Sequence, residues 1–142
     1  MLLPAPEILG IVDDACAPLE LATFVPGAAG PPHLPVGVLV SHREAAIGFD
    51  VRVTDAVTGE LFAERVGGYF ALAGWTEQDP VGWTWKDLVV DYGTDFGRGV
   101  VCDLEGRTAR VEVTVGSIGD ELVSTASVDL PADFDDRWGL CP

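Results

Sequence analysis

The imidazole and hydroxyl groups of the chain are its first candidates for catalysis, because a histidine base beside a serine is the core of a hydrolase triad. His33 lies in a proline-rich stretch, and His42 follows Ser41 directly in the tetrapeptide SHRE. Ser41 and Ser117 both offer a hydroxyl, but neither stands in the GxSxG turn that exposes a nucleophilic serine. We therefore interpret His42 as a polar residue at a strand end, assign no catalytic residue and expect a protein that is not an enzyme.

Three cysteines offer either thiolate ligands for zinc or the halves of a disulfide: Cys16, Cys102 and Cys141. Structural zinc sites use clustered ligands at short spacings, and no two of these cysteines have the CxxC spacing. Their odd number is simplest to reconcile with a reducing compartment, where thiols stay unpaired. The sequence therefore predicts neither a zinc site nor a disulfide.

Carboxylates at short spacings are the ligands that calcium prefers, and the chain has two groups of them. Asp133, Asp135 and Asp136 form one group, and Asp91 and Asp95 form the other. Neither group follows the EF-hand loop pattern, so we interpret both as solvated acidic segments. The phosphate-binding motif GxxxxGK[ST] does not occur either. The sequence thus predicts no metal and no cofactor.

Four tryptophans are the most distinctive aromatic feature: Trp75, Trp83, Trp85 and Trp138. Trp83 and Trp85 are two residues apart in a β-rich segment, so they share one face of the expected strand. If they are buried, they belong to the core. If they are exposed, they form a flat platform for a sugar ring or a protein partner. We favour the core for at least one of them, and the sequence leaves both alternatives open.

The charge of the chain limits what it binds. The 142 residues include 23 acidic and 8 basic side chains, a formal net charge of −15. Such a surface repels phosphates and anionic lipid headgroups, so we expect no direct binding to nucleic acid or to a membrane surface. The first residues lack a positive n-region, and no apolar run reaches the ~20 residues of a membrane span. We expect a cytoplasmic protein, or one that joins a virion after synthesis.

Alternation of apolar with polar or small residues predicts strands between residues 36 and 130. The residues expected to face the core are Ile47, Phe49, Val51, Val53, Val111, Val113 and Val115. A turn at 55–59 predicts one hairpin, and Glu105-Gly106 predicts another, in which 100–104 pairs with 107–115. Pro131 is expected to end the last strand. About seven or eight short strands predict an all-β fold, either an antiparallel β-sandwich, with an Ig-like sandwich as one form, or a small barrel.

Residues 1–35 differ from the rest because they hold seven of the ten prolines. We expect a proline-rich N-terminal arm with a short helix at about residues 5–16, which Pro18 ends. The β domain then spans 36–130, and residues 131–142 form an acidic C-terminal tail. The arm has much apolar surface, so it either covers its own domain or mediates assembly, and we favour assembly.

These observations favour a non-enzymatic structural or assembly protein with protein partners in a homo- or hetero-oligomer. The abundance of Ala, Gly, Val and Asp, with a single Lys, is typical of a GC-rich genome. Our most specific expectation is therefore a virion component, a capsid decoration, head–tail or tail protein, of an actinobacterial phage. The alternatives are a small β-barrel enzyme and a small binding module, which either holds carbohydrate through Trp83 and Trp85 or acts as an acidic inhibitor or immunity-type protein. The candidate interaction residues are Leu2, Leu3, Ile8, Leu9, Val12, Phe24, Trp83 and Trp85.

Overall fold

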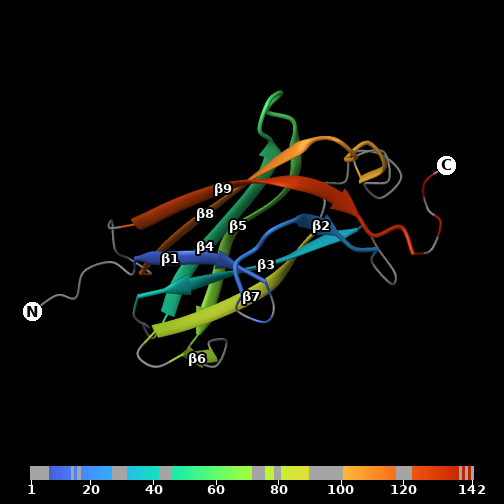
Figure 1. Ribbon diagram of the computed structural model, residues 1–142. Coiled ribbons are helices and arrows are strands. Elements are labelled where there is room, and N and C mark those ends of the chain that lie inside the picture. The colour runs from blue at the N-terminus through green and yellow to red at the C-terminus, as the bar shows by residue number, and fades with distance from the viewer. Residues whose placement is uncertain are drawn as a thin grey trace, which may run out of the picture.

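The computed structural model describes residues 7–13, 15, 17–26, 32–41, 46–71, 76–78, 81–89, 101–117, 123–137, 139 and 141. Of these, residues 46–49, 65–71, 76–78, 81–89, 117 and 123 are described by their backbone alone. This part of the chain is mostly β-strand, as predicted (Figure 1). The strands are β1 (Ile8–Val12), β2 (Ala22–Phe24), β3 (His33–Val40), β4 (Ala46–Asp55), β5 (Leu61–Ala71), β6 (Thr76–Gln78), β7 (Val81–Val89), β8 (Thr108–Ser117) and β9 (Val123–Phe134).

The strands form two sheets, and β2 connects them. One sheet has the order β1-β3-β7-β6, and the other has the order β2-β9-β8-β4-β5. All neighbouring strands are antiparallel except β2, which runs parallel to β9. Phe24 of β2 lies opposite Phe134 of β9, and the next residue, Val25, exchanges two backbone hydrogen bonds with His33 of β3. Because Phe24 and Val25 are adjacent, this short segment ties the second sheet to the first.

One hydrophobic core contains residues of both sheets. Strand β3 contributes Leu34, Val36, Val38 and Val40 to this core. Strands β4 and β8 contribute Val51, Val53, Val111, Val113 and Val115. These last five are the predicted core residues whose side chains are described, and each is at most 2 % exposed, so this part of the prediction is confirmed. The alternate positions Arg52 and Glu112 lie opposite one another in the ladder and are exposed. The side chains of Ile47 and Phe49 lie outside the described part.

The short helix predicted near residues 5–16 is wrong for residues 8–12, because these form β1. β1 pairs with β3, with Ile11 opposite Val38 and Val12 opposite Gly37. The spacing of the apolar residues suits one face of a helix, but a helix this short is marginal by itself, whereas the edge of β3 offers partners for the backbone groups of β1. Further along the predicted arm, Phe24 is fully buried in the core. The described residues before 35 therefore contribute strands and core side chains.

The hairpin predicted between 100–104 and 107–115 is also wrong. Residues 101–104 form a turn, in which the N–H of Leu104 donates to the carbonyl of Val101. β8 lies instead between β4 and β9. Val101 and Leu104 are both buried in the core. The apolar residues that suggested a strand therefore contact the core from a turn.

Pro131 does not end the last strand, because β9 continues to Phe134. The N–H of the next residue, Ala132, donates to the carbonyl of Arg107 at 3.0 Å, on the β8 side. Backbone groups alternate in direction along a strand, so the nitrogen of Pro131 points away from β8. Pro131 therefore removes no hydrogen bond between β9 and β8, and proline in a strand usually occupies such a position.

The hairpin predicted around residues 55–59 is confirmed, and a buried carboxylate holds its turn. Asp55 is 5 % exposed, and its Oδ1 accepts the N–H groups of Val57 at 2.7 Å and Thr58 at 2.8 Å. Its Oδ2 accepts the Nε–H of Arg107 at 2.7 Å. Hydrogen bonds to the charged form, first from the Thr58 backbone and then from Arg107, lower the pKa of Asp55 to about 2.

We expect Asp55→Asn to lower the Tm near neutral pH, because asparagine loses the charge that Arg107 binds. The folded-state pKa of Asp55 lies below the ordinary value of 3.8, so its stabilising contribution is complete above that value and is lost as the pH falls through about 2. The Tm difference between wild type and variant, measured by circular dichroism, should therefore shrink over this interval. Asp129→Asn is the control, because it removes only an exposed ion pair with Arg110. A difference for Asp55→Asn that persists in full at the lower pH would contradict the assignment.

Candidate protein-binding groove

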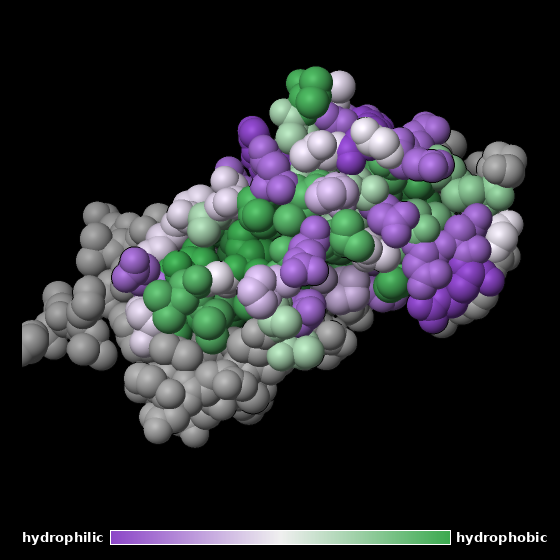
Figure 2. All heavy atoms as spheres, in the orientation of Figure 1, coloured by the Kyte–Doolittle hydropathy of each residue, from purple (hydrophilic) through white to green (hydrophobic). Residues whose placement is uncertain are grey.

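An apolar groove of about 430 Å³ runs between β1 of one sheet and β9 of the other. Its lining consists of Ile8, Leu9, Gly10, Ile11, Val12, Pro18, Leu19, Leu39, Ala126, Ser127 and Val128, and we call it the β1–β9 groove. Figure 2 shows apolar side chains gathered over β1 and below β9, with the surface hollowed between them. Leu9 is 51 % exposed, so apolar surface of the groove is open to solvent.

The groove exists because β1 and β9 lie at or near the edges of their sheets. Among the described strands, β1 has only β3 beside it, and β9 has β2 beyond it only at Ala132–Phe134. The chain passes from β1 towards β2 through Pro18 and Leu19, which also line the groove. The N–H of Leu19 donates to the carbonyl of Ile11 at 3.0 Å, which fixes this crossing against β1.

The backbone of β9 presents hydrogen-bonding groups on the side away from β8. The N–H of Ala132 donates to the carbonyl of Arg107, so the backbone groups of Ala132 point towards β8. Because backbone groups alternate in direction along a strand, Leu130, Val128 and Ala126 also point their N–H and C=O groups towards β8. The intervening residues Thr125, Ser127 and Asp129 point theirs the other way. All three are exposed, and no described strand pairs with them on that side. Within the described part of the chain, this stretch of β9 is therefore an open sheet edge beside the groove.

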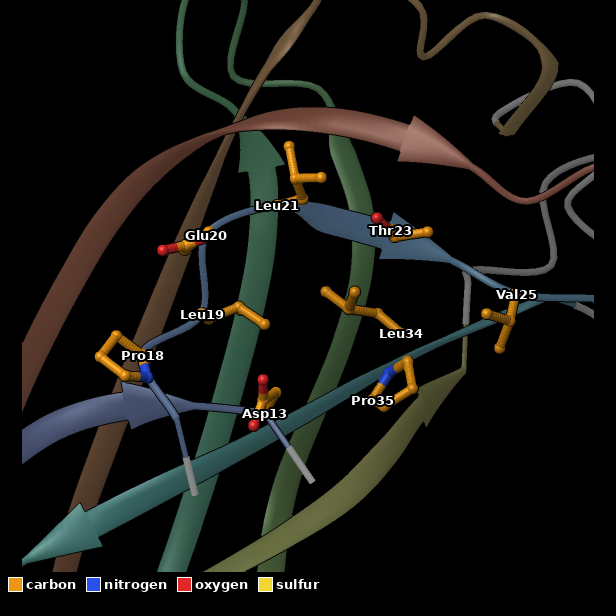
Figure 3. Close-up of a pocket in the computed structure, with 9 residues that line it drawn as sticks. All are labelled: Asp13, Pro18, Leu19, Glu20, Leu21, Thr23, Val25, Leu34 and Pro35. Atoms are coloured by element: carbon orange, nitrogen blue, oxygen red, sulfur yellow. The ribbon is translucent and has the colours of Figure 1, made fainter. Parts of the chain in front are cut away.

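A second cavity, of about 330 Å³, lies against the same crossing segment (Figure 3). In Figure 3, Leu19 and Leu34 extend towards one another across it. Asp13 is part of the lining, but its Oδ1 accepts the N–H groups of Ala15 at 2.9 Å and Ala17 at 3.0 Å. This carboxylate therefore shapes the turn after β1. We interpret the second cavity as a continuation of the apolar surface rather than as a chemical site.

Carboxylates dominate the charge near the β1–β9 groove. Each arginine whose side chain is described is ion-paired: Arg52 with Glu64, Arg107 with Asp55 and Glu60, Arg110 with Asp129, and Arg137 with Asp135. Glu7 immediately precedes β1, and Glu20 follows Leu19. Both are exposed, and neither forms an ion pair with another described residue. Among the described residues, the charges next to the groove that lack an ion-pair partner are therefore negative. Each described arginine, including Arg110 beside the β9 edge, is already paired with a carboxylate.

The structure brings together three of the predicted interaction residues, because Ile8, Leu9 and Val12 all line the groove. Phe24 lies in the core instead, and Leu2 and Leu3 lie outside the described residues. Leu39, Ala126 and Val128 also line the groove, although they are not among the predicted interaction residues. The alternation in the last strand was a signal for the latter two, but only the pairing of strands shows that they lie near β1.

The backbones of Trp83 and Trp85 lie in β7, opposite Leu39 and Gly37 of β3. Their side chains, on which the choice between core and binding platform depends, lie outside the described part. Trp75 and Trp138 also lie outside it.

The polar candidates for catalysis and metal binding do not converge in the described part of the chain. His33 is in β3, and the Oγ of Ser41 accepts the N–H of Glu7 at 2.9 Å, which holds the start of β1. Asp135 is paired with Arg137. No three His, Cys, Asp or Glu residues group as metal ligands among the described residues. His42, Asp91 and Asp95 are outside those residues.

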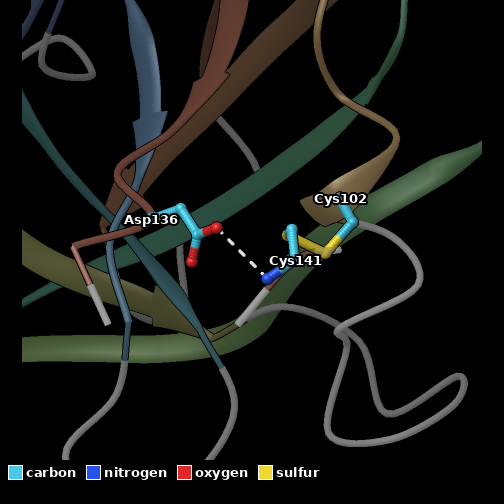
Figure 4. Close-up of a disulfide and its surroundings, with 3 residues drawn as sticks. All are labelled: Cys102, Asp136 and Cys141. Atoms are coloured by element: carbon cyan, nitrogen blue, oxygen red, sulfur yellow. Dashed lines mark hydrogen bonds between the residues drawn. A yellow bond between two sulfur atoms is a disulfide. The ribbon is translucent and has the colours of Figure 1, made fainter. Parts of the chain in front are cut away.

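Cys102 and Cys141 form a disulfide, with 5.5 Å between their Cα atoms, so the prediction of no disulfide is wrong (Figure 4). The bond joins the 101–104 turn to the C-terminal segment, where the N–H of Cys141 donates to Oδ2 of Asp136 at 3.1 Å. An odd number of cysteines excludes only that all of them pair. The fold decides which two, here 39 residues apart in the sequence, come within bonding distance.

The chain matches no protein-family model, no curated protein sequence and no solved structure. Within the described residues, no helix has the length and apolar character needed to cross a bilayer.

Proposed function

We propose that this chain is a non-enzymatic assembly protein that binds a protein partner in the β1–β9 groove. The observation that carries the proposal is the groove itself, an apolar hollow of about 430 Å³ between the edges of two sheets. Leu9 on its surface is half exposed. Apolar surface left in water costs free energy in proportion to its area, and a contiguous patch of it marks a contact site more often than an isolated residue does.

The proposal includes a finer description of the fold, a β-sandwich that is open along β1 and β9. The core shared by strands of both sheets supports stacking of the sheets. In such a sandwich, the inner faces reach solvent where no strand or loop covers the gap between sheet edges. The groove then corresponds to this uncovered side.

Within this class, our most specific proposal is a virion component of an actinobacterial phage, a capsid decoration, head–tail or tail protein. Two observations support it. The composition is typical of a GC-rich genome. The Cys102–Cys141 disulfide suits a protein that works outside a reducing cytoplasm, as virion surface proteins do.

Leu9→Glu is expected to weaken binding of the native partner by at least roughly tenfold, because it places a charge in an apolar contact. The test is recovery of the partner with tagged, full-length protein from the native source after mild cross-linking. Val57→Glu is the matched control, since Val57 is 88 % exposed on the β4–β5 turn, away from the groove. Wild type and Val57→Glu should recover the same stoichiometric partner, and Leu9→Glu should not. If all three proteins recover the partner equally, or if only the wild type recovers it, the proposed function is contradicted.

A further inference from the structure

We infer that the partner adds an extended, cationic strand to the open edge of β9. This inference rests on the proposed function and specifies the chemistry of the partner. Strand addition to an exposed edge is a common mode of peptide recognition, in which backbone hydrogen bonds provide affinity and side-chain pockets provide specificity. The β1–β9 groove and its edge supply both components.

The backbone component comes from Thr125, Ser127 and Asp129. Their N–H and C=O groups point away from β8, and the three residues are exposed. In the described part of the chain, β2 begins to pair with β9 only at Ala132. The free stretch is long enough for an incoming strand to form several ladder hydrogen bonds before it meets β2.

The apolar component comes from the groove next to this edge. Ala126 and Val128 alternate with the three edge residues and line the groove together with Leu9 of β1. Side chains of an added strand alternate between its two faces, so every second one would point into the groove. A strand with alternating apolar residues can therefore form backbone hydrogen bonds with the β9 edge and place its apolar side chains in the groove.

The charge of the protein selects a cationic partner. Glu7 and Glu20 are exposed next to the groove, and the described arginines are already paired with carboxylates. A second copy of this chain would bring a further net charge of −15 to the same interface. Like charges disfavour that association, whereas lysines or arginines at the outward positions of an incoming strand complement the surface.

The test uses the full-length protein and a short, acetylated and amidated peptide that alternates valine and lysine, with binding measured by fluorescence anisotropy. Ser127→Pro removes one outward N–H and leaves the β8 ladder intact, as Pro131 does naturally. It is expected to weaken peptide binding by roughly five- to tenfold, because one edge hydrogen bond is lost and the proline ring obstructs the incoming strand. Ser127→Ala is the matched control, since it keeps the N–H, and it should bind like wild type.

Two changes to the peptide test the same contacts without altering the protein. Methylation of the backbone nitrogens on one edge of the peptide should weaken binding to wild type, which keeps the test valid if Ser127→Pro fails to fold. A peptide that alternates valine and glutamate should bind far more weakly than the lysine peptide. Equal binding of the two peptides would overturn the cationic chemistry, and equal binding to Ser127→Pro and wild type would overturn strand addition.

The failure of this inference is distinguishable from failure of the proposed function. If Leu9→Glu loses the native partner and Ser127→Pro retains it, the groove binds a partner but not by strand addition. If the protein self-associates without peptide and Ser127→Pro abolishes this association in sedimentation velocity, the occupant is a second copy and the cationic partner is wrong.

Discussion

Replacing Phe24 with alanine is expected to lower the free energy of unfolding by about 3–5 kcal/mol, the usual cost of deleting a buried phenyl ring. Phe24 is fully buried, and β2 is only three residues long. This short strand pairs with β9, and its neighbour Val25 bridges to β3. The variant therefore leaves a cavity at the point where the chain ties the two sheets together. Urea denaturation followed by tryptophan fluorescence measures the change.

Leu21→Ala is the control for this prediction, because Leu21 immediately precedes β2 and is 50 % exposed. Its truncation should lower the free energy of unfolding by about 1 kcal/mol or less, since folding buries only about half of the Leu21 surface. Equal costs for the two variants would show that β2 does not pack into the core. The same geometry means that removing residues 1–35 is a poor test of assembly, because it removes core residues together with any contact surface.

Loss of the Cys102–Cys141 disulfide is expected to lower the free energy of unfolding by about 3–4 kcal/mol, the chain-entropy effect for a loop of this length. The sequence separation is 39 residues, and the bond holds the C-terminal segment against the 101–104 turn. The measurement compares urea denaturation of the wild type with that of a Cys102→Ser, Cys141→Ser double variant.

A reductant provides the control for the disulfide prediction. It should destabilise the wild type to the level of the double variant and leave the double variant unchanged. Intact mass of the unreduced wild type should show the loss of two hydrogens. A wild type whose stability is indifferent to reductant would contradict the bond.

The strands with clear alternation were predictable because one face of each packs on the core and the other meets water. Val51 and Val53 of β4, and Val111 and Val113 of β8, are buried as the pattern indicated. The turn at Asp55 was predictable for a related reason. Aspartate accepts backbone N–H groups two and three residues ahead, so its preference for turns is local.

The errors occur where the conformation depends on distant residues. Residues 8–12 are apolar at a spacing that also suits a helix, and they form a strand because the edge of β3 is available to them. The β1–β9 groove could be predicted only in part, from the apolar character of Ile8, Leu9 and Val12. Its other wall comes from Ala126 and Val128, more than a hundred residues further along the chain.

The sequence by itself determined the all-β class, the inward face of the central strands and the acidic surface, because side-chain alternation and charge are properties of neighbouring residues. Only the tertiary structure decided the path of residues 7–13 and 17–26, the pairing of Cys102 with Cys141 and the edge of β9 that the described strands leave open. Each of these depends on which segments come together across a long loop. The free energy of such contacts comes from segments that are far apart in the sequence, so the pattern of neighbouring residues does not show which of them meet.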